Sequence, residues 1–210
     1  MNPDNVTAHQ RLGFLLFNVK HQFQEGLEHT AQALRLDPQN GFAQSDLGVA
    51  LLSRNAPDKA IPHLQAALAA LPFSREPQYQ PQVVRVYLGK ACLQCNRYTE
   101  AATNFQESIR LAPDNPEAHY LLALALACQG ETDPAAGQVD QAVALKPQID
   151  TSVVLHELLA ENYARAGRLP EAIHSAEHAL QIARAAGKND LAERIAARLA
   201  RYQATAARSR

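Results

Sequence analysis

Tryptophan is absent from this chain of 210 residues, and aromatic residues as a whole make up only 6% of it. β-Sheets are enriched in aromatic and β-branched residues, whereas the alanine and leucine that dominate here suit closely packed helices. The composition therefore predicts an all-α fold.

Cysteine and net charge are also scarce. The three cysteines, Cys92, Cys95 and Cys128, are an odd number and too few for a disulfide framework, which fits a reducing compartment. Twenty basic and 21 acidic residues leave a formal charge of -1, so no overall field attracts nucleic acid or an anionic membrane. We expect no nucleic-acid partner.

Long apolar runs and catalytic motifs are missing as well. No stretch reaches the roughly 20 apolar residues that span a bilayer, and residues 1–10 do not resemble a secretion signal. We therefore expect a soluble, cytoplasmic chain without direct membrane insertion. No G-x-S-x-G, Walker or G-x-G-x-x-G motif is present, so we expect no enzyme activity, no catalytic residue and no cofactor.

What the sequence does contain is an internal repeat. Equivalent blocks are spaced 35, 41, 34 and 37 residues apart and begin at Leu12-Gly13, Leu47-Gly48, Leu88-Gly89, Leu122-Ala123 and Leu159-Ala160. Twelve positions after the small residue of each of the last four blocks another small residue recurs, and twenty-four positions after that of the middle three a proline recurs: Ala60, Ala101, Ala135 and Ala172, then Pro72, Pro113 and Pro147. In the first block these positions shift by one residue, to Gly26 and Pro38.

This pattern resembles the tetratricopeptide repeat (TPR), a helix-turn-helix unit of 34 residues. The closest copies read Leu88-Gly89, Cys92, Ala101, Phe105, Ser108, Pro113 and Leu122-Ala123, Leu126, Ala135, Val139, Ala142, Pro147. The resemblance implies an all-α, right-handed TPR superhelix of five antiparallel helix pairs plus a C-terminal capping helix.

The resemblance also implies one solenoid domain over residues 1–210. We expect repeats at about 6–40, 41–74, 82–115, 116–149 and 153–186, an insert at 73–81 and the capping helix at 188–205. In that last helix the apolar residues share one face, as expected where a helix covers the exposed surface of a terminal repeat: Leu191, Ile195, Leu199 and Tyr202.

Several residues predict where the helices end. Asparagine and glycine tolerate the left-handed conformation that closes many helices, and they stand at the expected ends of first helices: Asn55, Asn96, Gly130 and Gly167. Proline cannot continue a helix, so the second helices should end at Pro38, Pro72, Pro113 and Pro147. Pro62 lies inside the second helix of the second repeat and predicts a kink.

Histidine recurs where the TPR motif has tryptophan. That position holds His9, Gln44, Arg85, His119 and His156, and its recurrence predicts a packing role. His174 and His178 lie one helical turn apart, and Cys92 and Cys95 have the spacing of a redox or zinc pair. Neither set has its remaining ligands in the sequence, so we predict no metal site and a buried, structural Cys92.

In the TPR family the first helix of each pair lines the concave face, so the resemblance implies a groove for a protein or peptide ligand. We predict that the groove is apolar at its N-terminal half and acidic at its C-terminal end, and that it is lined by Phe14, Phe17, Phe42, Val49, Leu52, Val83, Val86, Lys90, Glu117, Tyr120, Leu124, Glu157 and Glu161. A large exposed apolar patch usually marks an interaction site. The alternative is that these side chains pack within the array or are covered by the insert or by upstream repeats.

Some TPR proteins hold the C-terminal carboxylate of chaperones with lysine, asparagine and arginine on three successive first helices. The equivalent positions here carry Gln10, Phe14, Asp46, Val83 and Tyr87, so that carboxylate clamp is not expected.

We therefore predict a protein–protein interaction scaffold that binds a peptide or helix segment of a partner in its concave groove. Two alternatives stay open. The first is a non-catalytic C-terminal TPR tail of a larger enzyme, because residues 186–202 resemble the end of some bacterial membrane glycosyltransferases and the chain begins in an inter-repeat turn, Pro3-Asp4-Asn5. The second is a scaffold that self-associates through its N-terminal repeat.

Overall fold

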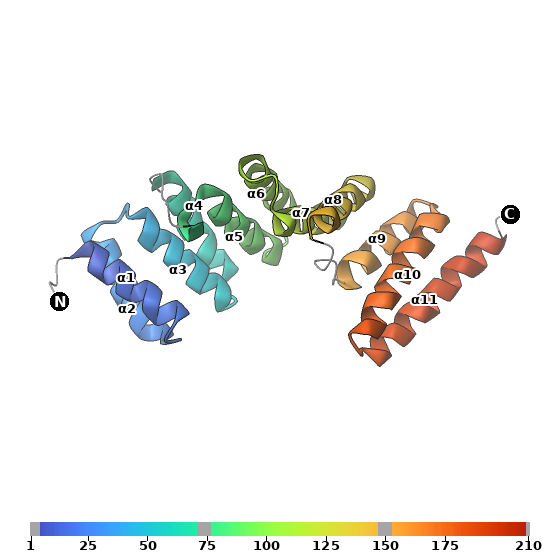
Figure 1. The fold of residues 1–210 in the computed structure, drawn as a ribbon, viewed down its shortest axis with the longest axis horizontal. Helices are drawn as coiled ribbons and strands as arrows, with labels where there is room; N and C mark the ends of the chain where they lie inside the picture. Colours follow the sequence, from blue (N-terminus) through green and yellow to red (C-terminus); the bar gives the residue numbers. More distant parts are fainter. Residues whose placement is uncertain (1–4, 71–76, 147–152, 209–210) are drawn as a thin grey trace. The chain divides into compact units, whose positions relative to one another are not determined.

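The computed structural model describes residues 5–70, 77–146 and 153–208, which form eleven α-helices and one short 3-10 helix, η1 (Figure 1). The elements are α1 (Val6–Asn18), α2 (Phe23–Leu36), α3 (Gly41–Ser53), α4 (Pro57–Ala70), η1 (Pro77–Tyr79), α5 (Pro81–Gln94), α6 (Tyr98–Leu111), α7 (Pro116–Gln129), α8 (Thr132–Leu145), α9 (Val153–Arg165), α10 (Leu169–Ala185) and α11 (Asn189–Arg208). The predicted all-α fold is confirmed.

The helices pack as pairs of consecutive elements. The chain divides into two compact units, residues 1–113 with α1 to α6 and residues 114–210 with α7 to α11. That these units form the single solenoid domain expected from the sequence stays a prediction. The pairs are α1 with α2, α3 with α4 and α5 with α6 in the first unit, then α7 with α8 and α9 with α10 in the second, where α11 packs on α10.

Small residues let the two helices of a pair approach closely, as the repeat pattern predicts. A Cβ atom added at Gly48 would lie 2.6 Å from the Leu64 side chain, and one added at Gly89 would lie 2.5 Å from the Phe105 ring. Both distances are shorter than van der Waals contact allows. Glycine is therefore required at these two crossings because of space.

The helix ends follow the prediction closely. Asn55 and Asn96 have φ angles of 56° and 57°, and Gly130 and Gly167 have φ angles of 82° and 74°. All four predicted C-terminal residues are thus left-handed. In the first repeat the corresponding residue is His21, with φ 54°, which the sequence pattern did not indicate.

Prolines limit the second helices without breaking α4. Pro38 and Pro113 follow the ends of α2 and α6, whereas Pro72 and Pro147 lie outside the described residues. Helix α4 continues across Pro62, whose side chain is exposed. Only the Asp58 carbonyl, in the first turn and at the surface, loses its helical donor, which is why the helix tolerates this proline.

Polar pairs replace the motif's tryptophan between the two helices of a repeat. His119 and His156 are only 8% and 6% exposed, which confirms their packing role. The His119 Nδ1 atom lies 2.7 Å from the Gln138 Oε1 atom, nineteen residues further along the chain. In the second repeat the two residue types exchange helices. The histidine, His63, is on the second helix, and its Nδ1 atom lies 2.7 Å from Oε1 of Gln44 on the first.

Candidate functional site

First helices of neighbouring repeats contact one another within each unit. In the first unit α1 contacts α3 and α3 contacts α5, and in the second unit α7 contacts α9. In each unit taken by itself, we call the solvent-facing side of its first helices the first-helix face. All of the predicted groove residues lie on them, and most are half-buried.

In the N-terminal part of this face, Tyr79 of the insert packs against two predicted groove residues. Tyr79, at the end of η1, is 1% exposed and lies against α1 and α3. Its ring packs edge-on against Phe42 with centroids 4.8 Å apart, and its centroid is 6.4 Å from that of Phe14. Of the interpretations open at the sequence level, coverage by the insert therefore applies to Phe14 and Phe42.

The Tyr79 hydroxyl enters a buried polar network. It donates to the Asp46 carboxylate, with oxygen distances of 2.9 and 3.0 Å, and the Gln10 side-chain amide donates to the Tyr79 oxygen at 2.8 Å. The same amide donates to Asp46 at 2.5 Å. Burial and the neighbouring Asp46 carboxylate raise the pKa of Tyr79 above its ordinary value, so the phenol stays protonated and keeps donating.

Two predicted groove residues take part in packing instead. Val86 is 5% exposed and belongs to the core around α5. Phe17 packs against Phe23, with ring centroids 5.4 Å apart, and against the backbone at Gly26, where an added Cβ would lie 2.7 Å from its ring. The single-residue shift in the first repeat explains this, because it leaves Gly26 as the small partner of an aromatic side chain on α1.

The remaining predicted groove residues of the first unit are three aliphatic side chains and one lysine. Val49, Leu52 and Val83 are half-buried, and the Lys90 ammonium lies 5.5 Å from the centroid of the Tyr87 ring. This cation–π contact holds Lys90 along the helix.

In the second unit the face combines apolar side chains with paired carboxylates. Tyr120 and Leu124 are half-buried, Glu117 is exposed, and Val154 is 67% exposed. The predicted acidic end is offset by arginines: Glu157 lies 3.3 Å from Arg198 on α11, and Glu161 lies 2.5 Å from Arg165.

Comparison with known proteins identifies the repeat. A model described as "Tetratricopeptide repeat" matches residues 20–75, and one described as "TPR repeat" matches residues 89–130. The chain is a TPR protein. A search of curated proteins finds no match.

Solved structures of TPR proteins share the fold. YrrB, a TPR protein with an unusual peptide-binding site, is 19% identical over 86% of this chain and 88% of its own, with a TM-score of 0.73. MamA is 21% identical over 90% of this chain and 96% of its own, with a TM-score of 0.70. MamA 41-end from Desulfovibrio magneticus RS-1 is 16% identical over 86% and 96%, with a TM-score of 0.66. At these identities the likeness shows the fold alone.

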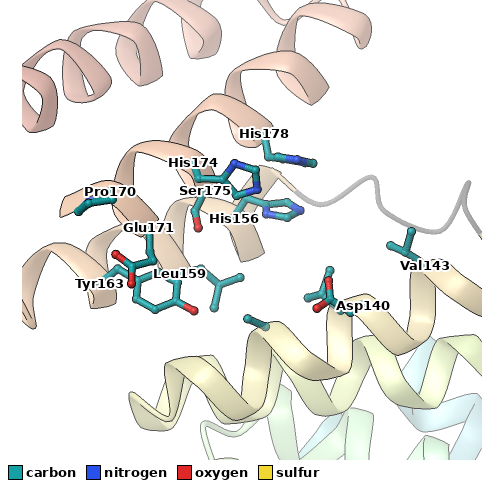
Figure 2. A pocket seen from close by; sticks show the side chains of 12 residues that line it. Asp140, Val143, His156, Leu159, Tyr163, Pro170, Glu171, His174, Ser175 and His178 are labelled. Carbon is teal, nitrogen blue, oxygen red and sulfur yellow. The ribbon is translucent and has the colours of Figure 1, made fainter. Parts of the chain in front are cut away.

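A separate pocket of about 490 Å³ lies between α8 and the α9–α10 pair of the TPR array. Figure 2 shows His156, His174 and His178 close together, across the pocket from Asp140 and Val143. The His178 ring centroid is 5.3 Å from that of His156 and 4.9 Å from that of His174. Within the described ranges, no group of three or more His, Cys, Asp or Glu side chains is arranged to hold a metal ion.

An ion-pair network borders this pocket and joins the last two repeats. Arg168 lies 2.6 Å from Asp133 on α8 and 2.8 Å from Glu171 on α10, and its guanidinium lies 4.7 Å from the centroid of the Tyr163 ring. Tyr163 in turn donates to Asp133 at 3.1 Å. The arginine lowers the pKa of both carboxyl groups, chiefly through these hydrogen bonds.

Cys92 and Cys95, which have the spacing of a redox or zinc pair, lie in different environments. Cys92 is buried, as predicted, and burial raises its pKa to about 11. The Cys95 thiol donates to Asp58 at 3.2 Å, and its pKa is also raised. A raised pKa keeps both thiols in their less reactive form near neutral pH.

None of the described helices combines the length and apolar character that crossing a membrane requires.

Proposed function

We propose that this TPR protein is a protein–protein interaction scaffold that binds a peptide or helical segment of a partner in a concave groove formed by its first helices. The observation that carries the proposal is apolar exposure at repeated positions of the first-helix face. Val154 is 67% exposed, and Val49 and Leu124, which occupy the same position in two repeats, are half-buried. Apolar side chains on a shared face are a common feature of peptide-binding surfaces.

The fold likeness supports this class of function. YrrB, which has the same fold, is described as having a peptide-binding site. Helical repeats of this kind present an extended surface that can contact a peptide along several repeats.

The lining indicates what kind of segment would bind. Val49, Leu52 and Leu124 offer aliphatic contacts. A basic residue of the partner would have to compete with Arg198 and Arg165 for Glu157 and Glu161. Apolar contacts should therefore contribute more to affinity than charge, and affinity should depend only weakly on salt.

The proposal is tested with peptides selected from a displayed random library against the whole chain. For a selected peptide, Val49→Glu or Leu124→Glu should weaken binding at least about tenfold, because a carboxylate would be desolvated against an apolar ligand without a counter-ion. Isothermal titration calorimetry measures the dissociation constant, and circular dichroism checks that the variants melt as the parent chain does.

The matched controls place the same charge on second helices, at the exposed Gln106 of α6 and Gln141 of α8. Gln106→Glu and Gln141→Glu should bind the peptide as the parent chain does. Normal binding by both groove variants, together with loss of binding in these controls, would refute the proposed groove.

A further inference from the structure

Tyr79 is held in a site built from side chains of other elements. Among the largest fully buried side chains of the described residues, it is the one contributed by the insert, through the short helix η1. The site consists of Gln10 and Phe14 on α1 and Phe42 and Asp46 on α3.

The geometry of this site suits a phenol in particular. Phe42 and Phe14 contact the ring. Asp46 and Gln10 both bond to the hydroxyl group, one as acceptor and the other as donor. The Asp46 carboxylate accepts a hydrogen bond from the phenol hydroxyl, and the Gln10 amide donates one to the phenol oxygen. A phenylalanine ring would fit between the same walls but would leave the buried carboxylate without this donor, which is costly.

The site also lies where the proposed partner would bind. Phe14 and Phe42 belong to the predicted groove, so Tyr79 packs on part of the face to which we propose that a peptide binds. Extended peptides on such faces commonly bind through a few buried anchor side chains, with tyrosine among the most frequent.

We propose that Gln10, Phe14, Phe42 and Asp46 form a receptor site for a tyrosine side chain, which Tyr79 occupies in the unbound chain and which a tyrosine-bearing partner peptide occupies in its place. The exchange by a partner rests on the proposed function, whereas the phenol specificity of the site does not. Tyr79 acts as an internal competitor, so the apparent affinity for an added tyrosine depends on the fraction of chains in which Tyr79 is out of the site.

The phenol specificity is tested with small molecules on the full-length chain. Tyr79→Ala should leave the site vacant, so that p-cresol raises the melting temperature and binds at least about tenfold more tightly than toluene, which has the ring without the hydroxyl. The parent chain should show neither effect. Adding Asp46→Asn to the Tyr79→Ala chain should remove most of the preference for p-cresol. Equal binding of p-cresol and toluene, or no binding of either, would overturn the proposal.

A milder variant keeps the test decisive where Tyr79→Ala does not fold. Tyr79→Phe retains the ring and removes only the hydroxyl that meets Asp46. It should lower the melting temperature by several degrees, whereas the matched Tyr202→Phe change on α11 should not. A Tyr79→Phe chain as stable as the Tyr202→Phe chain would contradict a hydroxyl-specific site.

Competition is tested with N-acetyltyrosinamide, with N-acetylphenylalaninamide as the control ligand. Weakening the internal tyrosine should strengthen binding of the added one, so affinity should increase from the parent chain to Tyr79→Phe and from there to Tyr79→Ala. The phenylalanine analogue should bind more weakly to each. The same affinity in all three chains would show that Tyr79 and the added tyrosine do not share a site. Because no partner peptide is used, these results are independent of the proposed function.

Discussion

At Gly89 the backbone of α5 lies so close to α6 that an added Cβ would stand 2.5 Å from the Phe105 ring, which is fully buried. Gly89→Ala should therefore lower the free energy of unfolding by roughly 1–3 kcal/mol through overpacking, despite the better helix propensity of alanine. Urea unfolding monitored by circular dichroism measures this change.

Gly137 of α8 provides the matched control, since it is exposed and an added Cβ there would meet nothing within 4 Å. Gly137→Ala should raise the free energy of unfolding by about 0.5–1 kcal/mol, because only the helix propensity changes. If both alanine variants gained stability alike, close approach at Gly89 would not be what requires glycine.

The polar pair that His63 forms with Gln44 makes stability depend on pH. Burial lowers the pKa of His63 below its ordinary value of 6.5, so the unfolded chain binds this proton more readily than the folded chain. Stability should consequently decrease as the pH falls below about 6.5, until the pH drops below the lowered pKa of the folded state. Melting temperatures from pH 8 to pH 5 should decline less for His63→Gln than for the parent chain.

His21 is exposed in the turn after α1 and serves as the control, because His21→Asn keeps a residue that tolerates its left-handed backbone. This variant should follow the parent chain across the same pH range. A His63→Gln chain with an unchanged pH dependence would show that His63 does not cause the loss.

Residues at positions set by the repeat could be predicted from the sequence, whereas the contacts of the insert residue Tyr79 could not. Asn55 and Gly130 end their helices through their own backbone preferences, which the repeat spacing places correctly. Tyr79 lies outside the repeat, so periodicity carries no signal for its contacts with Gln10 on α1 and Asp46 on α3. One local hint existed, because Asp46 is the one charged residue of α3.

At the scale of the element, α11 closes the second unit. Ala192, Ile195 and Leu199 are buried against α10 and belong to one core cluster with Ala176 and Leu180. The amphipathic pattern at 188–205 predicted this helix. It could not predict the pairing of Arg198 with Glu157, because that contact depends on the position of α11 beside α9.

Truncation before Lys188 should destabilise the chain severely. Burial of Ile195 and of Leu199 contributes roughly 1.5–3 kcal/mol each to the free energy of unfolding. Without α11 the apolar surface of α10 would be exposed, which should promote aggregation. Differential scanning calorimetry should show a large loss of melting temperature. Truncation after Ala204, which retains Ile195, Leu199 and Tyr202, should have little effect; equal losses in the two truncations would contradict a capping role for the buried residues.

At the scale of the whole molecule, the TPR repeats and the all-α fold followed from a spacing that five blocks share. The groove was less predictable, because the sequence places residues on the first helices but does not say which are covered. Val86 is buried, Phe14 and Phe42 contact Tyr79, and Val154 is more exposed than any of them. The tail of a larger enzyme and self-association through the N-terminal repeat stay predictions.

The central claim is that partners bind to the first-helix face, and photo-crosslinking tests it most directly. A benzophenone placed within a library-selected peptide should crosslink to the whole chain, and mass spectrometry identifies the attached residues. The account predicts attachment within the first helices, such as Gly41–Ser53 of α3 and Pro116–Gln129 of α7. Attachment confined to the second helices, such as Pro57–Ala70 of α4 and Thr132–Leu145 of α8, would contradict it.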